Sequence, residues 1–359
     1  MDPAVARAMT VTASDVLAAQ ARLRKYLDVT PTHYAERFGV WLKLENLQRT
    51  GSYKVRGALN ALLAARERGD DRYVITASAG NHAQGMAWAA YRLGIPAITV
   101  MPKNAPDTKI AGVAHWGATV RLHGDTYDDA KAFAAELAEQ NGFRLLSAFD
   151  DPDVIAGQGT VGLEIATAMN PDVVLALKSQ GVRIIGAQVE GVDAMARALR
   201  GDRSLRDPAA SLADGVRVKE PGYLTERVLQ TLLDDVVIVR EAELRETVVR
   251  LALEEHVIAE GAGALALAAG KRIAGKRKCA VVSGGNLDAG VLAKLLSEIR
   301  PRAPRKPRRR VQERLMSPAA KTAPPIRKGF AAGPPTEATE RNKTTTRKTR
   351  IEFHEEVLA

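Results

Sequence analysis

The 359-residue sequence contains a single cysteine, Cys279, and aromatic side chains make up only 4% of it. One cysteine excludes an internal disulfide framework and any zinc site built from cysteines. The six histidines are scattered and lack the H-E-x-x-H spacing of a helical zinc site, so we expect no metal centre. No apolar run reaches the roughly 18 residues of a membrane span, and no secretory signal opens the chain. These absences predict a soluble, cytoplasmic protein.

An excess of one charge is also missing from most of the chain, although the formal net charge is +10. Residues 300–359 carry sixteen Lys+Arg and six Asp+Glu, so the rest of the chain is neutral overall. This last segment is rich in Pro, Arg, Lys and Thr and poor in core-forming side chains, which predicts a disordered tail. A neutral folded part with few aromatic residues makes nucleic acid an unexpected partner. We interpret the basic run 308–310 as solvated rather than phosphate-binding.

Short β-rich runs alternate with helical ones before this tail, with Gly and Pro at the junctions. The runs that read as buried strands are residues 73–76, 97–100, 119–122, 182–188, 236–239 and 278–282. The runs that read as helices are residues 13–26, 81–93, 107–116, 127–140, 192–199, 241–255 and 288–300. This alternation predicts an α/β protein with a parallel sheet covered by helices.

The first polar, glycine-containing run spans residues 43–58. We expect Gly51 and Ser52 to form a turn and an N-cap, which places Lys54 in the first turn of the following helix. A cation there meets the positive end of the helix dipole, so the position favours an uncharged amine. An exposed helix lysine is the simpler interpretation, but the position suits an amine nucleophile better.

Two further runs stand where predicted strands end. Residues 76–85 follow a strand and open a helix, so free backbone N–H groups, Ser78 and Asn81 form a pocket suited to a carboxylate or phosphate. Residues 282–288 follow the last strand, and ligands of open α/β sheets gather at such carboxyl ends. Two shorter runs resemble further loops that begin helices, at residues 157–160 and 260–263.

Three motifs of these runs together resemble those of the fold-type II pyridoxal-phosphate enzymes, and within them those of the threonine dehydratase (threonine ammonia-lyase) and serine racemase group. The motifs are GSYKVRGA, SAGNHAQG and SGGN. The resemblance implies pyridoxal 5′-phosphate as cofactor. It matches Lys54 to the Schiff-base lysine, Asn81 to the residue that hydrogen-bonds the ring hydroxyl, and Ser283 to the residue at the pyridine nitrogen. It also matches Ser78, Asn81 and His82 to the loop that binds the substrate carboxylate.

The resemblance, which covers about residues 10–299, also implies a reaction. The imine-bound cofactor withdraws electrons from the substrate Cα, and Lys54, once displaced by the substrate amine, removes the Cα proton. The β-hydroxyl then leaves, and the released enamine hydrolyses to a 2-oxo acid and ammonia. Racemases of this group have a serine at the position of Ala79 as a second proton donor. Without that hydroxyl, dehydration of threonine, and more slowly of serine, is favoured over racemisation.

The resemblance further implies two domains, each with a mostly parallel sheet flanked by helices. We expect a small domain at residues 45–145, inserted into a large cofactor-binding domain at residues 1–44 and 146–299. Residues 300–359 form the tail, where biosynthetic relatives carry a regulatory domain. Because relatives are dimers or tetramers, we also expect a homo-oligomer.

The sequence departs from the family pattern near Val174. Relatives have a strand there that ends in a four-glycine loop around the cofactor phosphate, whereas this chain runs straight past it. We expect a deleted central strand and glycine loop, which would break the sheet and remove phosphate-binding N–H groups. A non-catalytic relative and a serine racemase-like enzyme therefore stay open beside the lyase. Gln188 stands where racemases have a cation-binding glutamate, so we expect no strong Mg²⁺ dependence.

Overall fold

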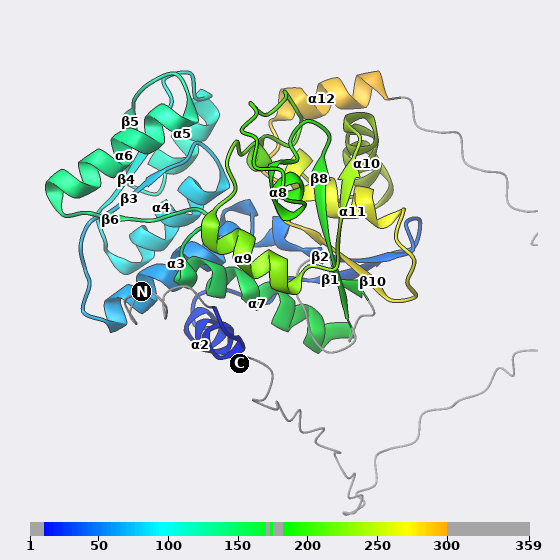
Figure 1. Ribbon diagram of the computed structural model, residues 1–359, viewed down its shortest axis with the longest axis horizontal. Coiled ribbons are helices and arrows are strands. Elements are labelled where there is room, and N and C mark those ends of the chain that lie inside the picture. The colour runs from blue at the N-terminus through cyan, green and yellow to red at the C-terminus, as the bar shows by residue number, and fades with distance from the viewer. Residues whose placement is uncertain (1–10, 170–172, 175–181, 300–359) are drawn as a thin grey trace, which may run out of the picture. The chain divides into compact units, whose positions relative to one another are not determined.

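The computed structural model describes residues 11–169, 173–174 and 182–299 (Figure 1). Within this part of the chain the strands form two sheets, one of six strands and one of four. The predicted tail at residues 300–359 lies outside the described residues. No helix of the described part is long and apolar enough to cross a membrane.

The six-stranded sheet has the order β1-β2-β10-β7-β8-β9 and is parallel except for the antiparallel hairpin β1–β2. Its strands are β1 Thr32–Ala35, β2 Val40–Leu44, β10 Lys278–Val282, β7 Val173–Val174, β8 Arg183–Val189 and β9 Asp235–Val239. Consecutive residues of a strand point to opposite faces, and those of β10 enter two separate cores. Ala280 packs in the core that contains α11, and Cys279 in the core that contains Ile165 of α7. Helices therefore cover both faces, as a parallel sheet requires.

The four-stranded sheet has the order β5-β4-β3-β6 and is parallel throughout. Its strands are β3 Val74–Ala77, β4 Ala97–Met101, β5 Thr119–Leu122 and β6 Arg144–Leu145. On one face Ile75 packs against Ala130 and Ala134 of α6, and on the other Val74 packs against residues of α3 and α4. Figure 1 shows these cyan strands surrounded by their helices.

Eleven helices accompany the strands in the described part of the chain, and some of them begin at capping residues. They are α2 Ala13–Leu23, α3 Lys54–Glu67, α4 Asn81–Leu93, α5 Asp107–Ala114, α6 Tyr127–Asn141, α7 Pro152–Met169, α8 Ala194–Leu199, α9 Tyr223–Leu232, α10 Glu241–Glu254, α11 Gly261–Gly270 and α12 Ala289–Glu298. Short 3₁₀ turns are η1 Glu45–Leu47, η2 Arg49–Gly51 and η3 Asp214–Val216. In α6, Thr126 and Asp129 form a reciprocal capping box, and Asp288 caps α12.

The predicted alternation of strands and helices is confirmed, with most boundaries within two residues, but the run at 157–160 was misread. It does not begin a helix: it lies inside α7, which starts at Pro152. A Cβ atom at Gly157 would stand 2.6 Å from the backbone oxygen of Arg56, so this glycine lets α7 approach α3 closely. The run at 260–263 does open a helix, α11.

A short central strand is present where we expected one to be deleted. Val173 and Val174 form β7, which pairs in parallel with β10 on one side and with β8 on the other. The expected break in the sheet is therefore wrong at this point, because two residues suffice to bridge the neighbouring strands. Residues 175–181, where the expected loss of the glycine loop falls, lie outside the described residues.

The two sheets draw their strands from different parts of the chain. All strands of the four-stranded sheet lie within residues 74–145, and all strands of the six-stranded sheet lie outside that range. The domain boundaries at 44/45 and 145/146 remain a prediction. One strand of each sheet leads into a polar run of the sequence: β3 leads into residues 76–85 and β10 into residues 282–288.

Candidate active site

Lys54 is the first residue of α3, as the sequence predicts, but the helix is capped differently. The N-cap is Tyr53 instead of Ser52, and its backbone is already helical (φ −62°, ψ −18°) without a side-chain cap. Lys54 Nζ donates to the backbone oxygen of Ala148 at 2.9 Å and lies 5.2 Å from the centre of the Tyr53 ring. Within the described chain no carboxylate pairs with this amine, so a neutral acceptor holds it.

Backbone hydrogen bonds fasten the turn before Lys54 to the loop after β10. Tyr53 N donates to the backbone oxygen of Ser283 at 3.1 Å, and Ser52 forms an isolated antiparallel bridge with Gly284. Ser283 is the first residue after β10. The structure thus brings the predicted Schiff-base lysine and the predicted pyridine-nitrogen residue to one place.

The loop between β3 and α4 leaves the amino end of α4 without a side-chain cap. Gly80 is the N-cap, and Ser78 Oγ accepts the backbone N–H of Gly80 at 3.2 Å. The first N–H groups of α4, which begins with Asn81, have no acceptor within the helix. Such an end attracts an anion.

His82 lies in the first turn of α4 and is buried, with 2% of its surface exposed. Neither ring nitrogen has a hydrogen-bond partner among the described residues. Burial, assisted by the positive charge of Lys54, lowers the pKa of His82 to about 3. The backbone oxygen of Leu146 partly opposes this shift, although it is not placed to accept a hydrogen bond from the ring. The ring is therefore neutral at pH 7, with one donor and one acceptor. An unpaired buried polar group costs free energy, and in the part of the chain that the structure describes both ring nitrogens of His82 are free to form hydrogen bonds.

A chain of four polar groups links four of the five glycine-containing runs of the sequence. Asn286 Nδ2 donates to the backbone oxygen of Thr50 at 2.8 Å and to Asn81 Oδ1 at 2.7 Å. Asn81 Nδ2 in turn donates to Glu260 Oε1 at 2.5 Å. We call these groups (Thr50 O, Asn286, Asn81 and Glu260) the amide relay. Thr50 adopts a left-handed backbone (φ 62°), which is costly for a β-branched residue and is typical of functional sites.

Glu260, which the sequence analysis did not assign, is a buried carboxyl group at the N-cap of α11. Its backbone N–H donates to the oxygen of Gly284 at 3.1 Å. Burial raises the pKa of Glu260 to about 7, and the negative charge of Asp214 adds to this, while the hydrogen bond from Asn81 opposes it. The one sequence signal that could have identified Glu260 was its position in the run 260–263, which was recognised only as a helix start. Acidic residues favour helix N-termini.

Two glycines allow the close contacts of this site. A Cβ atom at Gly85 would stand 2.9 Å from the backbone nitrogen of Val55, so only glycine lets α4 cross α3 beside Lys54. A Cβ atom at Gly284 would collide with Glu260 Oε1 and stand 3.0 Å from Asn81 Nδ2. The latter glycine therefore leaves room for the hydrogen bond between Asn81 and Glu260.

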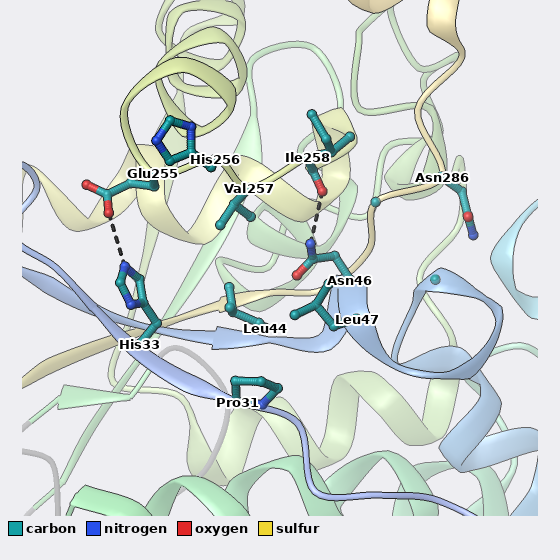
Figure 2. A pocket seen from close by; sticks show the side chains of 12 residues that line it. Pro31, His33, Leu44, Asn46, Leu47, Glu255, His256, Val257, Ile258 and Asn286 are labelled. Atoms are coloured by element: carbon teal, nitrogen blue, oxygen red, sulfur yellow. Dashed lines mark hydrogen bonds and ion pairs between the residues drawn. The ribbon is translucent and has the colours of Figure 1, made fainter.

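A cavity of about 530 Å³ adjoins the site but does not contain its reactive groups (Figure 2). Gly51, Gly285 and Asn286 line it, whereas Lys54 does not. In its wall the side chain of Asn46 donates to the backbone oxygen of Ile258 at 3.0 Å. The cavity thus borders the turn at Gly51, which leads into Lys54.

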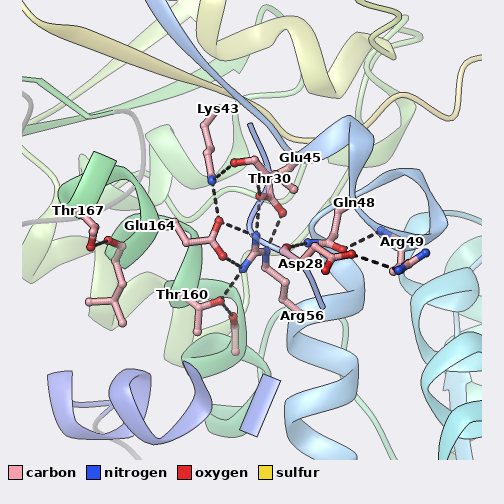
Figure 3. A network of polar contacts seen from close by, with 12 residues as sticks. Asp28, Thr30, Lys43, Glu45, Gln48, Arg49, Arg56, Thr160, Glu164 and Thr167 are labelled. Carbon is pink, nitrogen blue, oxygen red and sulfur yellow. Dashed lines mark hydrogen bonds and ion pairs between the residues drawn. The ribbon is translucent and has the colours of Figure 1, made fainter. Parts of the chain in front are cut away.

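A second polar network, which we call the charge cluster, surrounds the side chain of Arg56 in α3 (Figure 3). It consists of Lys43, Glu45, Arg56 and Glu164, all with side chains no more than 9% exposed. Arg56 forms two hydrogen bonds to each glutamate, at 2.7 to 3.0 Å, and Lys43 Nζ lies 2.5 Å from Glu164. Two cations and two anions balance, so the cluster carries no net charge.

The described residues contain no group of three or more His, Cys, Asp or Glu side chains placed to hold a metal ion. Gln188 uses its amide within its own loop, where Oε1 accepts from Ala196 N at 2.7 Å and Nε2 donates to Val192 O at 3.3 Å. Cys279 is buried, and burial raises the pKa of its thiol to about 12, so it is not a thiolate ligand at neutral pH.

Comparisons with known proteins agree on one family. A family model described as pyridoxal-phosphate dependent enzyme matches residues 23–285. The L-threonine ammonia-lyase of Thermotoga maritima is 38% identical over 316 residues, which cover 80% of this chain and 79% of that protein. The structure of processed threonine deaminase isoform 2 from Solanum lycopersicum matches with a TM-score of 0.73 at 33% identity, covering 79% and 86% of the two chains. Maize serine racemase matches with a TM-score of 0.73 at 28% identity, covering 79% and 96%.

Proposed function

This chain belongs to the family of pyridoxal-phosphate dependent enzymes, and we propose that it is a lyase that dehydrates and deaminates L-threonine, and L-serine more slowly. The products are ammonia and 2-oxobutanoate, or pyruvate from serine. The observation that carries this proposal is one cluster of groups: the Lys54 amine, the oriented Asn81 amide and the buried ring of His82. In the described part of the chain the amine has no carboxylate partner and the ring has no hydrogen-bond partner.

The groups of the site fit pyridoxal phosphate, which when bound supplies an electron sink for the substrate Cα. Lys54 would hold its aldehyde carbon, Asn81 its ring hydroxyl and Ser283 its pyridine nitrogen. Among the described residues, the ring nitrogens of His82 have no partner and α4 has no side-chain cap, and both observations support a ligand at this place.

The residues around Lys54 would bind the substrate, position it and favour elimination. The N–H groups at the start of α4, with Ser78 and neutral His82, bind the substrate carboxylate without adding a buried positive charge. This would fix the substrate so that Lys54 Nζ, once the substrate amine has taken its place on the cofactor, reaches the Cα proton and removes it. The neutral Ser283, in place of a carboxylate, favours elimination because it leaves the ring a moderate electron sink.

Serine racemisation is the second candidate, since structures similar to this one include a serine racemase. Racemisation needs a proton donor on the opposite face of Cα. Ala79, in the loop before α4, offers no hydroxyl there, and its methyl group packs on the core instead. This observation favours the lyase.

We further propose that the amino-acid substrate binds between a small domain of residues 45–145 and a large domain of residues 1–44 and 146–299. Asn81 comes from the first and Glu260 and Asn286 from the second, so their hydrogen bonds support a site completed across this division. The assembly we propose is a homo-oligomer in the cytoplasm.

The test is the visible absorbance of the full chain titrated with pyridoxal phosphate, beside Lys54→Ala. We expect a band of lysine-bound cofactor that is absent from the variant, followed by 2-oxobutanoate and ammonia from L-threonine faster than pyruvate from L-serine. A folded protein without the band would support the non-catalytic relative. Inversion of serine without ammonia would support the racemase.

Independence from Mg²⁺ is also part of the proposal. Both groups of the Gln188 amide are engaged within the protein, and a neutral amide binds cations weakly. We expect threonine turnover to survive treatment with a chelator. Activity that disappears and returns on addition of Mg²⁺ would contradict this expectation.

A further inference from the structure

The orientation of the Asn81 amide follows from the relay itself. The backbone oxygen of Thr50 can only accept, so the group of Asn286 that faces it must be Nδ2. The second hydrogen of this Nδ2 points to Asn81, at 2.7 Å, so the atom of Asn81 that receives it must be Oδ1. Asn81 Nδ2 is then left to face Glu260.

Glu260 accepts the first of the two hydrogens on Asn81 Nδ2, at 2.5 Å. One N–H of Asn81 remains, and no described residue takes it. With its oxygen held by Asn286 and its nitrogen by Glu260, the amide cannot turn over without losing two hydrogen bonds. The site therefore presents a donor at Asn81, never a carbonyl.

We propose that Glu260 is a positioning residue: it fixes the Asn81 amide so that its free N–H is offered to the ring oxygen of the bound cofactor. The inference rests on the proposed function for its ligand, but the contact between Glu260 and Asn81 exists without it. A donor suits an anionic ring oxygen, whereas an amide turned over would place two oxygens face to face.

The surroundings of Glu260 make this role depend on pH. The ionisable groups that face it are Asp214 of η3, Lys109 of α5 and Lys54 of α3, and Lys109 and Asp214 themselves pair at 2.5 Å. Its raised pKa of about 7 means that Glu260 changes charge near neutral pH. An ionised Glu260 is the stronger acceptor, so Asn81 is held more firmly above pH 7 than below it.

The first test measures cofactor binding to Glu260→Leu and Glu260→Gln. We expect the leucine variant to raise the Kd for pyridoxal phosphate about tenfold, because Asn81 loses its acceptor. Glutamine can still accept through its carbonyl, so its Kd should stay within about threefold but lose its change between pH 6 and 8. Glu226→Gln, an equally buried carboxyl group paired with Arg203, is the matched control and should bind as the wild type.

The second test uses the protein without cofactor, so that the two proposals can fail separately. The side-chain amide signals of Asn81, assigned by their loss in Asn81→Asp, are followed by NMR in each variant. We expect them to move toward those of a free amide in Glu260→Leu and to stay in Glu260→Gln. Unchanged signals and an unchanged Kd in the leucine variant would overturn the inference. Absence of the cofactor band in the wild type would overturn the proposed function, while the amide signals still decide the role of Glu260.

Discussion

The charge cluster and the amide relay differ in whether the hydrogen-bonding and charged groups in and beside them are satisfied. In the charge cluster every charged side chain meets at least one opposite charge, and Arg56 makes hydrogen bonds to two glutamates and to Thr160. Beside the amide relay, His82 has no hydrogen-bond partner among the described residues, and Lys54 donates to a backbone carbonyl instead of a carboxylate. The side chains of the charge cluster are no more than 9% exposed, whereas Glu260 is the one buried side chain of the amide relay and Asn286 at its other end is exposed.

Whether the groups of a network are satisfied indicates whether the network serves folding or ligand binding. A closed network of buried charges leaves nothing for a ligand to bind, and breaking it exposes an uncompensated charge. An open network keeps unpaired donors and acceptors at a cost in stability, which a ligand can recover. We therefore expect changes in the charge cluster to act on folding, and changes at the relay to act on binding and on pH dependence.

The largest expected effect comes from Arg56→Met, which removes the centre of the charge cluster. Two buried glutamates would lose their main partner, so the free energy of unfolding should fall by about 3–5 kcal/mol. Urea denaturation measures this change. Arg68→Met, which breaks an exposed ion pair with Asp153, is the control and should cost less than about 1 kcal/mol. Equal losses in the two variants would erase the distinction between buried and exposed pairs.

A smaller loss of stability is expected from Gly85→Ala, which places a methyl group in the contact between α3 and α4. The new methyl group would meet the backbone of Val55, which cannot move aside, so we expect a loss of about 1–3 kcal/mol in stability. Because Lys54 precedes Val55, cofactor binding should weaken as well. Gly112→Ala in α5, where the nearest atoms belong to a flexible glutamine side chain at 3.4 Å, should be neutral or stabilising. Thermal unfolding and the cofactor titration check both variants.

The smallest effect concerns pH. The folded pKa of His82, about 3, lies below its usual 6.5, so this group adds stability above pH 6.5 that is lost as pH falls toward 3. His82→Gln should remove this dependence, about 1 kcal/mol per pH unit between pH 4.5 and 6.5.

Glu260→Gln is the matched comparison, because the folded pKa of Glu260, about 7, lies above its usual 4.5. The wild type therefore loses stability from this group as pH rises from 4.5 to 7. Removing the carboxyl group should change the slope of stability against pH in the sense opposite to His82→Gln. Urea denaturation of the cofactor-free protein at several pH values measures both slopes, and slopes that change in the same sense would contradict the assignment.

Local patterns in the sequence predicted most of the fold. Strand 278–282 and helix 81–93 have the predicted bounds, because an apolar run or a helical period is a property of neighbouring residues. The N-cap at Ser52 and the helix start at 157–160 were wrong for one reason: partners distant in the sequence decide them. Ser52 pairs with Gly284, and Gly157 packs on Arg56.

The sequence by itself determined the chemical types at the site and their family, through Lys54, Asn81 and Ser283 in their glycine-containing runs. Only the tertiary structure decided which groups these residues face. Glu260 joins Asn81 although 179 positions separate them, and no local pattern records such a contact. The ionisation of Glu260 and His82 likewise depends on burial by surrounding elements, because desolvation by the assembled fold shifts a pKa more than sequence neighbours do.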